Sequence, residues 1–405
     1  MSAPRCPVCG ALLFLETLDC GACGTALGFH PPSIAFVALP VGDGSVRVDG
    51  VRWRRCANRA GNCNWLAPVA PVGEASDADE AGEAGGRCLS CRLTRRRPDA
   101  GDTAARSALA RVAVDKRRLL IQVMELGLPI TPHYERPGGL AFDLVSSHSG
   151  QRVTIGHANG VITIDLAESQ GDYREQLRVR LGEPYRTMLG HFRHEIGHYY
   201  QRILLGRAGD GPASEALWEE CRTLFGDERA SYKDARKRHY SEGAPEGWTS
   251  SYISDYATMH PWEDFAETFA HYLHITGTLS TAADAGLVLD SDRAGGIVVV
   301  DIVPRRSYRD HTAAELLRDW RWLSLMFNRV NRAMGQGDLY PFGIAPAVAE
   351  KLAFVHRIVG AGPVGAGPVG SGPVGSVVGL PAAAQPRGAN EMAPSGVIES
   401  AKVTE

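Results

Sequence analysis

Eight cysteines in the first quarter of the chain constrain its fold more than any other feature. Six of them form Cys-x-x-Cys pairs and two are more widely spaced: the pairs are Cys6/Cys9, Cys20/Cys23 and Cys88/Cys91, and the others are Cys56 and Cys63. Eight cysteines could form four disulfides in a secreted protein, but the chain starts Met-Ser-Ala-Pro-Arg, without a hydrophobic signal segment. We therefore expect a cytoplasmic protein, in whose reducing surroundings such cysteines bind metal.

The cysteines divide into two sets of four. The first set has the spacing of a zinc ribbon, in which each Cys-x-x-Cys-Gly turn directs its sulfurs at one ion: Cys6, Cys9, Cys20 and Cys23. The second set has the same number of ligands but a looser first pair: Cys56, Cys63, Cys88 and Cys91. We expect up to two structural zinc ions. Interleaved pairing of the eight cysteines and iron in place of zinc are the alternatives.

The overall charge offers no general attraction for nucleic acid or anionic lipid, so any such binding would have to be local. The 405 residues are 44% hydrophobic and 22% charged, as in an ordinary globular protein, and the formal charge of -3 provides no bulk positive field for nucleic acid. No apolar run approaches the roughly 18 residues that cross a bilayer, so no membrane partner is expected. Residues 1–100 contain 11 arginines and 10 acidic residues, with a cluster at Arg92 and Arg95–Arg97. For this region we favour a purely structural role. Docking of a protein partner is the second alternative, and nucleic-acid binding ranks below both.

Composition divides the chain into three regions. Residues 1–98 form the expected zinc-ribbon region, with two four-cysteine sites and many turn-forming residues. Residues 99–358 show the mixed periodicity of an α+β domain with a small β-sheet. Residues 359–405 hold three Gly-Pro-Val-Gly repeats. Because proline and glycine recur every few positions there, we expect a disordered tail.

Four helices and one hairpin are predicted in the central region. Apolar spacing predicts a helix from Asp102 or Thr103 to Gly127. Alternation around Asn159-Gly160 predicts a β-hairpin that pairs 153–155 with 161–166. Three further helices have proline or capping signals at their starts: Pro184 to Leu204 or Leu205, Pro261 to about Ile275, and a helix from Thr312 that buries Leu316, Trp320, Leu323, Phe327 and Val330.

The helix predicted from Pro184 contains the motif His194-Glu-Ile-Gly-His198. The two histidines lie about 40° apart around the axis and one turn apart along it, so both imidazoles can reach one ion. Glu195 lies about 100° from His194, where it can take a proton from water at the metal without being a ligand. The motif therefore predicts a catalytic zinc site, which requires a third protein ligand and an open coordination position.

The helix predicted from Pro261 offers the third ligand. Glu263 and Glu267 share one face; we favour Glu263 as the ligand and Glu267 as the acceptor that holds a ligand histidine, with the reverse as the alternative. His274 lies about 16 Å along the axis from Glu263, so both cannot bind one ion. Tyr256 is a candidate hydrogen-bond donor to the oxyanion of the transition state, and a structural tyrosine is an equal alternative.

A family resemblance follows from three segments: Gly190–Tyr200, His260–Glu267 and the cysteine-rich start. Together they resemble the bacterial zinc-binding metallopeptidases that carry an N-terminal zinc-ribbon domain. More broadly they are similar to gluzincins, in which a Glu on a second helix binds zinc and an acidic residue follows four positions later. The resemblance implies a zincin-like metallopeptidase domain with Glu263 as ligand and Glu267 behind it, and raises Tyr256 as a transition-state residue.

These features predict a zinc metallopeptidase with three zinc ions per chain, one of them catalytic. It would hydrolyse a peptide or protein substrate with Glu195 as general base. The alternative is a zinc-ribbon binding or regulatory protein whose HExxH domain is a non-catalytic scaffold held by metal. One hypothesis for the substrate is an extended peptide along the strand at 161–166.

Overall fold

The computed structural model describes residues 4–42, 44–69, 86–99, 101–147, 153, 155–169, 187–206, 211–296 and 298–362. The Gly-Pro-Val-Gly repeats and Pro184 lie outside the described residues. The first residues of the expected tail, 359–361, instead complete helix α9 (Pro346–Ala361). In the part of the chain that is described, no helix combines the length and apolarity required to cross a membrane.

The N-terminal region consists of two small antiparallel sheets joined by cysteine-bearing turns. The first pairs β1 (Leu27–His30) with β2 (Ala35–Ala38), and the second has the order β3-β4-β5, formed by Ser45–Val48, Val51–Arg55 and Leu66–Pro68. Short helices α1 (Leu89–Arg92), η1 (Pro31–Ser33) and η2 (Ala57–Gly61) complete it.

A four-stranded sheet links this region to the rest of the chain. Its order is β6-β7-β9-β8, formed by Thr94–Arg96, Ala141–Val145, Val161–Asp165 and Gly156–Ala158. β6 and β9 pair parallel to β7, whereas β8 pairs antiparallel to β9. β6 belongs to the cysteine-rich stretch, so one sheet contains strands from both parts of the sequence. The mixture of this sheet with long helices confirms the α+β class.

The predicted hairpin forms, but its first strand is displaced. Asn159 and Gly160 occupy positive φ angles of 49° and 85°, as a tight hairpin turn requires. Ala158 pairs with Val161, and β8 covers 156–158 rather than 153–155. β9 is paired on both sides, so the hypothesis of a peptide alongside 161–166 is wrong. β8 is one of the two edge strands of the described sheet, and β6 is the other.

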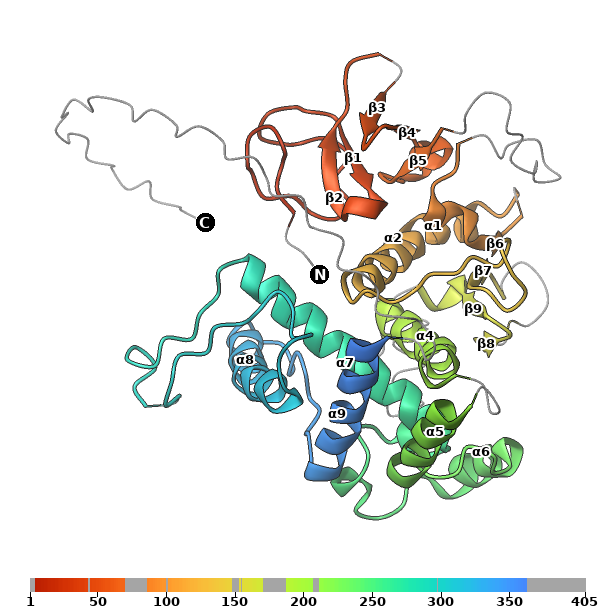
Figure 1. The fold of residues 1–405 in the computed structure, drawn as a ribbon, viewed down its shortest axis with the longest axis vertical. Helices are drawn as coiled ribbons and strands as arrows, with labels where there is room; N and C mark the ends of the chain where they lie inside the picture. Colours follow the sequence, from red (N-terminus) through yellow and green to blue (C-terminus); the bar gives the residue numbers. More distant parts are fainter. Residues whose placement is uncertain are drawn as a thin grey trace, which may run out of the picture. The chain divides into compact units, whose positions relative to one another are not determined.

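Three long helices pack on one another, α2 (Thr103–Glu125) on α4 (Met188–Leu205) and α4 on α7 (Pro261–Asp284), and each contributes several buried apolar residues to the core. Figure 1 shows α4 beside α7. The remaining helices are α5 (Pro212–Phe225), α6 (Tyr232–Glu242), α8 (Ala313–Ala333) and α9, with the short helices η3 (Leu166–Ser169), η4 (Trp248–Ser250) and η5 (Tyr256–Thr258).

Most predicted helix boundaries are confirmed, including the start of α7 at Pro261 and the end of α4 at Leu205, and two differ. The Asp102 side chain caps α2, and Thr312 forms a capping box with Glu315 at the start of α8, although Val330 near its end is exposed. Helix α4 starts at Met188 with Thr187 as its cap, later than Pro184. Helix α7 continues beyond Ile275 to Asp284.

Helix α2 connects the cysteine-rich region to the helices through three consecutive side chains. Lys116 is buried and donates to Ser90 O at 2.6 Å and to the hydroxyl of Thr94. Arg117 donates to the backbone oxygen of Asn62 at 3.2 Å. Arg118 pairs with Glu16 at 2.6 Å. The apolar core is continuous across this contact.

Candidate metal centre

Helices α4 and α7 approach closely at a glycine of the HExxH motif. A Cβ atom on Gly197 would lie 3.0 Å from the Cα and from the backbone oxygen of Ala266, too close for any larger residue without a shift of α7. Phe192, Ile196 and Phe269 are fully buried on the packed faces of the two helices. The close approach brings Glu263 on α7 to the histidines of α4.

Three donor atoms from these two helices converge. His194 Nε2 lies 2.9 Å from Glu263 Oε2, His198 Nε2 lies 3.3 Å from the same oxygen, and the two Nε2 atoms are 3.2 Å apart. Zinc at about 2.0–2.1 Å from each ligand in tetrahedral geometry separates its ligand atoms by about 3.3 Å. The spacing of this histidine–glutamate site, formed by His194, His198 and Glu263, therefore fits one zinc ion.

The protonation chemistry of the site also favours a cation. Glu263 is 3% exposed, and its Oε2 makes no hydrogen bond to the described residues. An ionised oxygen buried in this way is costly unless a positive charge neutralises it. The His194 and His198 side chains remain 13% and 17% exposed, so one side of the cluster is open to solvent.

A second set of residues holds the donors in place. His194 Nδ1 lies 2.7 Å from Glu267 Oε1, and Ser254 donates to the other Glu267 oxygen at 2.6 Å. The Tyr232 hydroxyl donates to Glu263 Oε1 at 2.8 Å. Burial would raise the pKa of Glu267, but its hydrogen bonds with His194 and Ser254 lower it to about 2, so it stays an acceptor.

Tyr232 and Ser254 did not emerge from the sequence. Tyr232 begins α6, and Ser254 precedes η5; neither has a fixed spacing to the HExxH motif. Only the fold brings them to the carboxylates of α7. In the sequence, a serine two residues before Tyr256 and a tyrosine at the start of a basic helix do not by themselves indicate a role at a metal site.

The predicted general base and oxyanion donor lie beside the cluster. Glu195 is 8% exposed, and its Oε2 has no hydrogen-bond partner among the described residues. Burial raises the pKa of Glu195. The Tyr256 ring centroid is 5.7 Å from that of His194. Burial and the nearby Glu263 raise the pKa of Tyr256 well above its usual value, so the phenol keeps its proton.

The edge strand β8 also contributes a side chain near the site. The His157 ring on β8 stacks on His198, with centroids 6.4 Å apart, and its Nε2 accepts a hydrogen bond from Gly160 N. Burial, together with His198 and Arg202, lowers the pKa of His157 to about 4, so it is neutral near pH 7. By contrast, His271 and His274 are buried in the core, where they contact Tyr340 and Arg193.

Both cysteine sets form four-sulfur clusters. In the outer cysteine site (Cys6, Cys9, Cys20 and Cys23), measured Sγ separations are 3.6 and 3.7 Å. In the inner cysteine site (Cys56, Cys63, Cys88 and Cys91) they are likewise 3.6 and 3.7 Å. These values match the edges of a tetrahedron with about 2.3 Å zinc–sulfur bonds and exceed the roughly 2.05 Å of a disulfide. Cys221 is buried outside both clusters.

Comparisons with known proteins match two family models to successive parts of the chain. Residues 105–358 match the model of a family described as "Putative zinc-binding metallo-peptidase", and residues 4–102 match a zinc-ribbon domain. Uncharacterised proteins of Mycobacterium tuberculosis and Mycobacterium bovis are 44% identical over 357 residues, which cover 88% of this chain and 94% of each relative. No solved structure is significantly similar.

Proposed function

Because the chain belongs to the putative zinc-binding metallo-peptidase family, we propose that it hydrolyses peptide bonds with a zinc ion held by His194, His198 and Glu263. The observation that carries this proposal is the convergence of their three donor atoms beside Glu195, whose buried Oε2 has no hydrogen-bond partner in the described part of the chain. Three protein ligands and a solvent-facing side leave a coordination position for a reactant, as catalytic zinc requires.

The chain's own residues account for the proton movements. Zinc, when bound, supplies Lewis acidity that lowers the pKa of water and polarises the scissile carbonyl. Glu195 takes the proton of the attacking water and delivers it to the leaving amine. Tyr256 donates a hydrogen bond to the carbonyl oxygen as negative charge develops there. Glu267, held by Ser254, accepts the Nδ1 proton of His194, so that Nε2 presents its lone pair to the metal.

The outer and inner cysteine sites complete the proposed zinc content. Each offers four sulfurs, which fill a tetrahedral ion and leave no position for a reactant. We therefore assign them to structural support, and expect three zinc ions per chain.

Metal content and hydrolysis together test the proposal. Elemental analysis should find three zinc ions per chain in the parent, two in His194→Ala, and three in the control His311→Ala, which removes an imidazole outside the cluster. The zinc-loaded parent should cleave a diverse peptide library. Two zinc ions in both parent and His194→Ala would leave the histidine–glutamate site without metal. Three zinc ions with no cleavage would favour a binding or regulatory scaffold instead.

A further inference from the structure

The described residues around the histidine–glutamate site include two groups of exposed cations on different elements. We infer that the substrate is an acidic peptide, with carboxylate side chains on both sides of the bond that is cleaved. This inference rests on the proposed peptidase activity and adds a substrate class to it. Three observations support it: the position of the two groups, the small number of acidic side chains near them, and the contacts that link each group to the metal ligands.

The first basic group consists of Arg202 and Arg136. Arg202 follows His198 by four residues on α4, so it continues the stripe of His194 and His198 by one more turn, about 6 Å along the axis. Its guanidinium lies beside Gly138, 3.2 Å from where a Cβ would stand, and Gly138 is two residues from Arg136. Both arginines are exposed.

The fold places this first group next to the edge strand β8. A Cβ on Gly160, in the turn between β8 and β9, would clash with the backbone oxygens of Gly138 and Gly139, so the segment that Arg202 contacts lies against this turn. Helix α4, which bears Arg202, also contacts β8. The first basic group therefore adjoins β8, whose outer edge is the place where an extended chain can add to the sheet.

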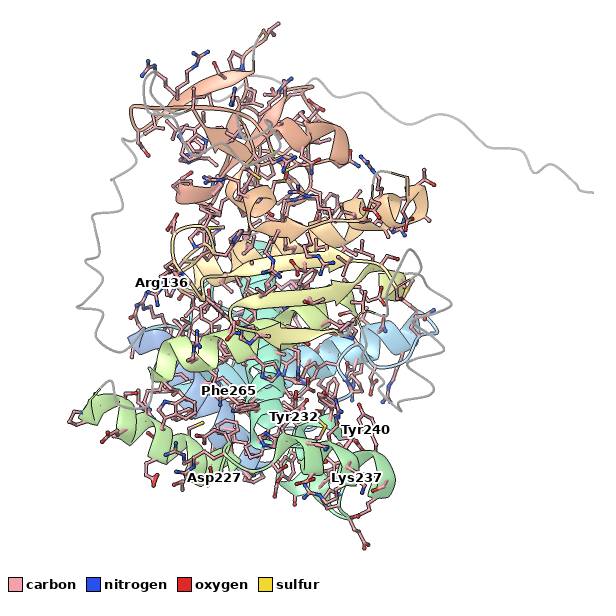
Figure 2. All side chains as sticks on the ribbon, turned by 90° about the vertical axis from the view of Figure 1, so that its right-hand side faces the viewer. Arg136, Asp227, Tyr232, Lys237, Tyr240 and Phe265 are labelled. Atoms are coloured by element: carbon pink, nitrogen blue, oxygen red, sulfur yellow. The ribbon has the colours of Figure 1, made fainter. Side chains whose placement is uncertain are left out.

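The second basic group lies on α6, which is joined to the metal site at its first residue. Tyr232 bonds to Glu263, and the following residues of the helix are predominantly cationic: Lys233, Arg236, Lys237 and Arg238. All four are exposed. Arg236 lies one turn from Tyr232, on the same face of α6. In Figure 2, Tyr232, Lys237 and Tyr240 lie on α6, on the side of Phe265 away from Arg136.

Few acidic side chains compensate these cations. None of the six basic residues takes part in a salt bridge with another described residue. Asp234 and Glu242 share α6 with four cations. Nearby carboxylates are engaged elsewhere: Asp255 contacts His239 at 3.4 Å, Asp227 pairs with Arg229, and Glu228 pairs with Arg222. Glu135 adjoins Arg136 and is the acidic neighbour of the first group.

Charges of one sign on both sides of a site attract ligands of the opposite sign and repel those of the same sign. A glutamate-rich peptide is attracted to a basic group on each side of the scissile bond, whereas a lysine-rich peptide is repelled by both groups. Nucleic acid could use the same cations, but residues 105–358 match a metallo-peptidase family, which favours a peptide in the site between them. The observations therefore favour a peptide.

Hydrolysis of matched peptides tests the inference. The probes are a fluorescein-labelled peptide of alternating glutamate and alanine and its counterparts with glutamine or lysine at every glutamate. We expect kcat/KM to be about tenfold higher for the glutamate than for the glutamine peptide at low ionic strength, and to fall towards equality in high salt. The ratio of kcat/KM for the glutamate peptide to that for the glutamine peptide should drop about threefold in Arg202→Gln and in the double variant Arg236→Gln/Lys237→Gln. It should stay unchanged in Arg329→Gln, an exposed position on α8.

Binding to the Glu195→Gln protein separates this inference from the proposed activity. Fluorescence anisotropy should show tighter binding of the glutamate peptide, weakened when Arg202→Gln is added. Selective binding without cleavage by the parent would support the acidic ligand and overturn the peptidase. Cleavage of all three peptides with equal kcat/KM would support the peptidase and overturn the preference for an acidic substrate. Displacement of the glutamate peptide by a smaller concentration of single-stranded DNA would overturn the peptide assignment in favour of nucleic acid.

Discussion

The inner cysteine site and the histidine–glutamate site both gather donors at zinc-like spacing, but they differ in how they are closed. All four cysteines of the inner site are buried, and Cys88 is 0% exposed. The histidine–glutamate site has three donors, and its histidine rings keep a solvent-facing side. Four buried donors are typical of a structural zinc site, whereas three donors with an open side are what the proposed reaction requires.

The surroundings of the two sites differ in the same way. The inner site is supported by a cation and a neutral donor: Lys116 lies beneath it, and Asn58 Nδ2 lies 3.6 Å from Cys91 Sγ. A zinc ion with four thiolates carries two negative charges, so a buried cation is suited to it. The histidine–glutamate site is surrounded by acceptors, Glu267 and Glu195, which orient a ligand or move a proton. The outer cysteine site, with Cys9 and Cys23 exposed, lacks the cover of the inner one.

The largest expected effect is the loss of the inner site. Cys88→Ser should release its zinc and lower the free energy of unfolding by at least about 5 kcal/mol, because the cluster holds β4, β5 and α1 against α2. Denaturant unfolding with elemental analysis measures both changes. Cys221→Ser, which removes a buried cysteine outside the clusters, is the matched control and should keep all its zinc. A Cys88→Ser protein as stable as the parent would contradict a structural role.

The next effect concerns the histidine–glutamate site and should leave the fold untouched. Glu195→Gln keeps the size of the side chain but removes the base, so kcat/KM on peptides should fall by about 10² to 10⁴, while zinc content and unfolding free energy stay constant. The exposed Glu246→Gln should keep full activity. If Glu195→Gln cleaved peptides as fast as the parent, the base would have to be another group.

A smaller effect tests the cation beneath the inner site. Lys116→Met keeps the length and apolar body of the side chain, but leaves Ser90 O and the Thr94 hydroxyl without their donor. We expect the free energy of unfolding to fall by about 3 kcal/mol with zinc retained. The exposed Lys233→Met should change it by less than about 0.5 kcal/mol. Equal stability of parent and Lys116→Met would mean that the buried ammonium contributes nothing net.

Sequence reasoning was most effective where function depends on local spacing. One helical turn separates His194 from His198, the Cys-x-x-Cys turns fix pairs of sulfurs, and Thr312 caps α8 through a residue three positions away. In each case the chain itself sets the geometry, so the residues predict it without knowledge of the rest of the fold.

The end of α7 shows why other features could not be predicted. Glycine and three threonines after Ile275 disfavour helix by intrinsic preference. The Thr276 and Thr281 hydroxyls are satisfied within the helix, where they donate to the backbone oxygens of Tyr272 and Gly277. The helix continues because α2 packs against it: Gly277 admits Gln122, whose Nε2 would lie 2.6 Å from a Cβ there. Tyr232 was missed for the same reason: its contact with Glu263 spans 31 residues and arises only when α6 packs beside α7.

The smallest expected effect probes the residue that orients a ligand rather than the ligands themselves. Glu267→Gln removes the charge that accepts the Nδ1 proton of His194, so the imidazole should be held less firmly with Nε2 towards the metal. We expect zinc affinity at the histidine–glutamate site to fall by about 10- to 100-fold, as measured by competition with a chromophoric chelator, with the zinc of both cysteine sites unaffected. Ser254→Ala, which loses only the hydroxyl bond to Glu267, should weaken the affinity less. Because both changes leave the three donors in place, unchanged affinity in Glu267→Gln would show that packing of α4 against α7 alone sets the geometry of the open site.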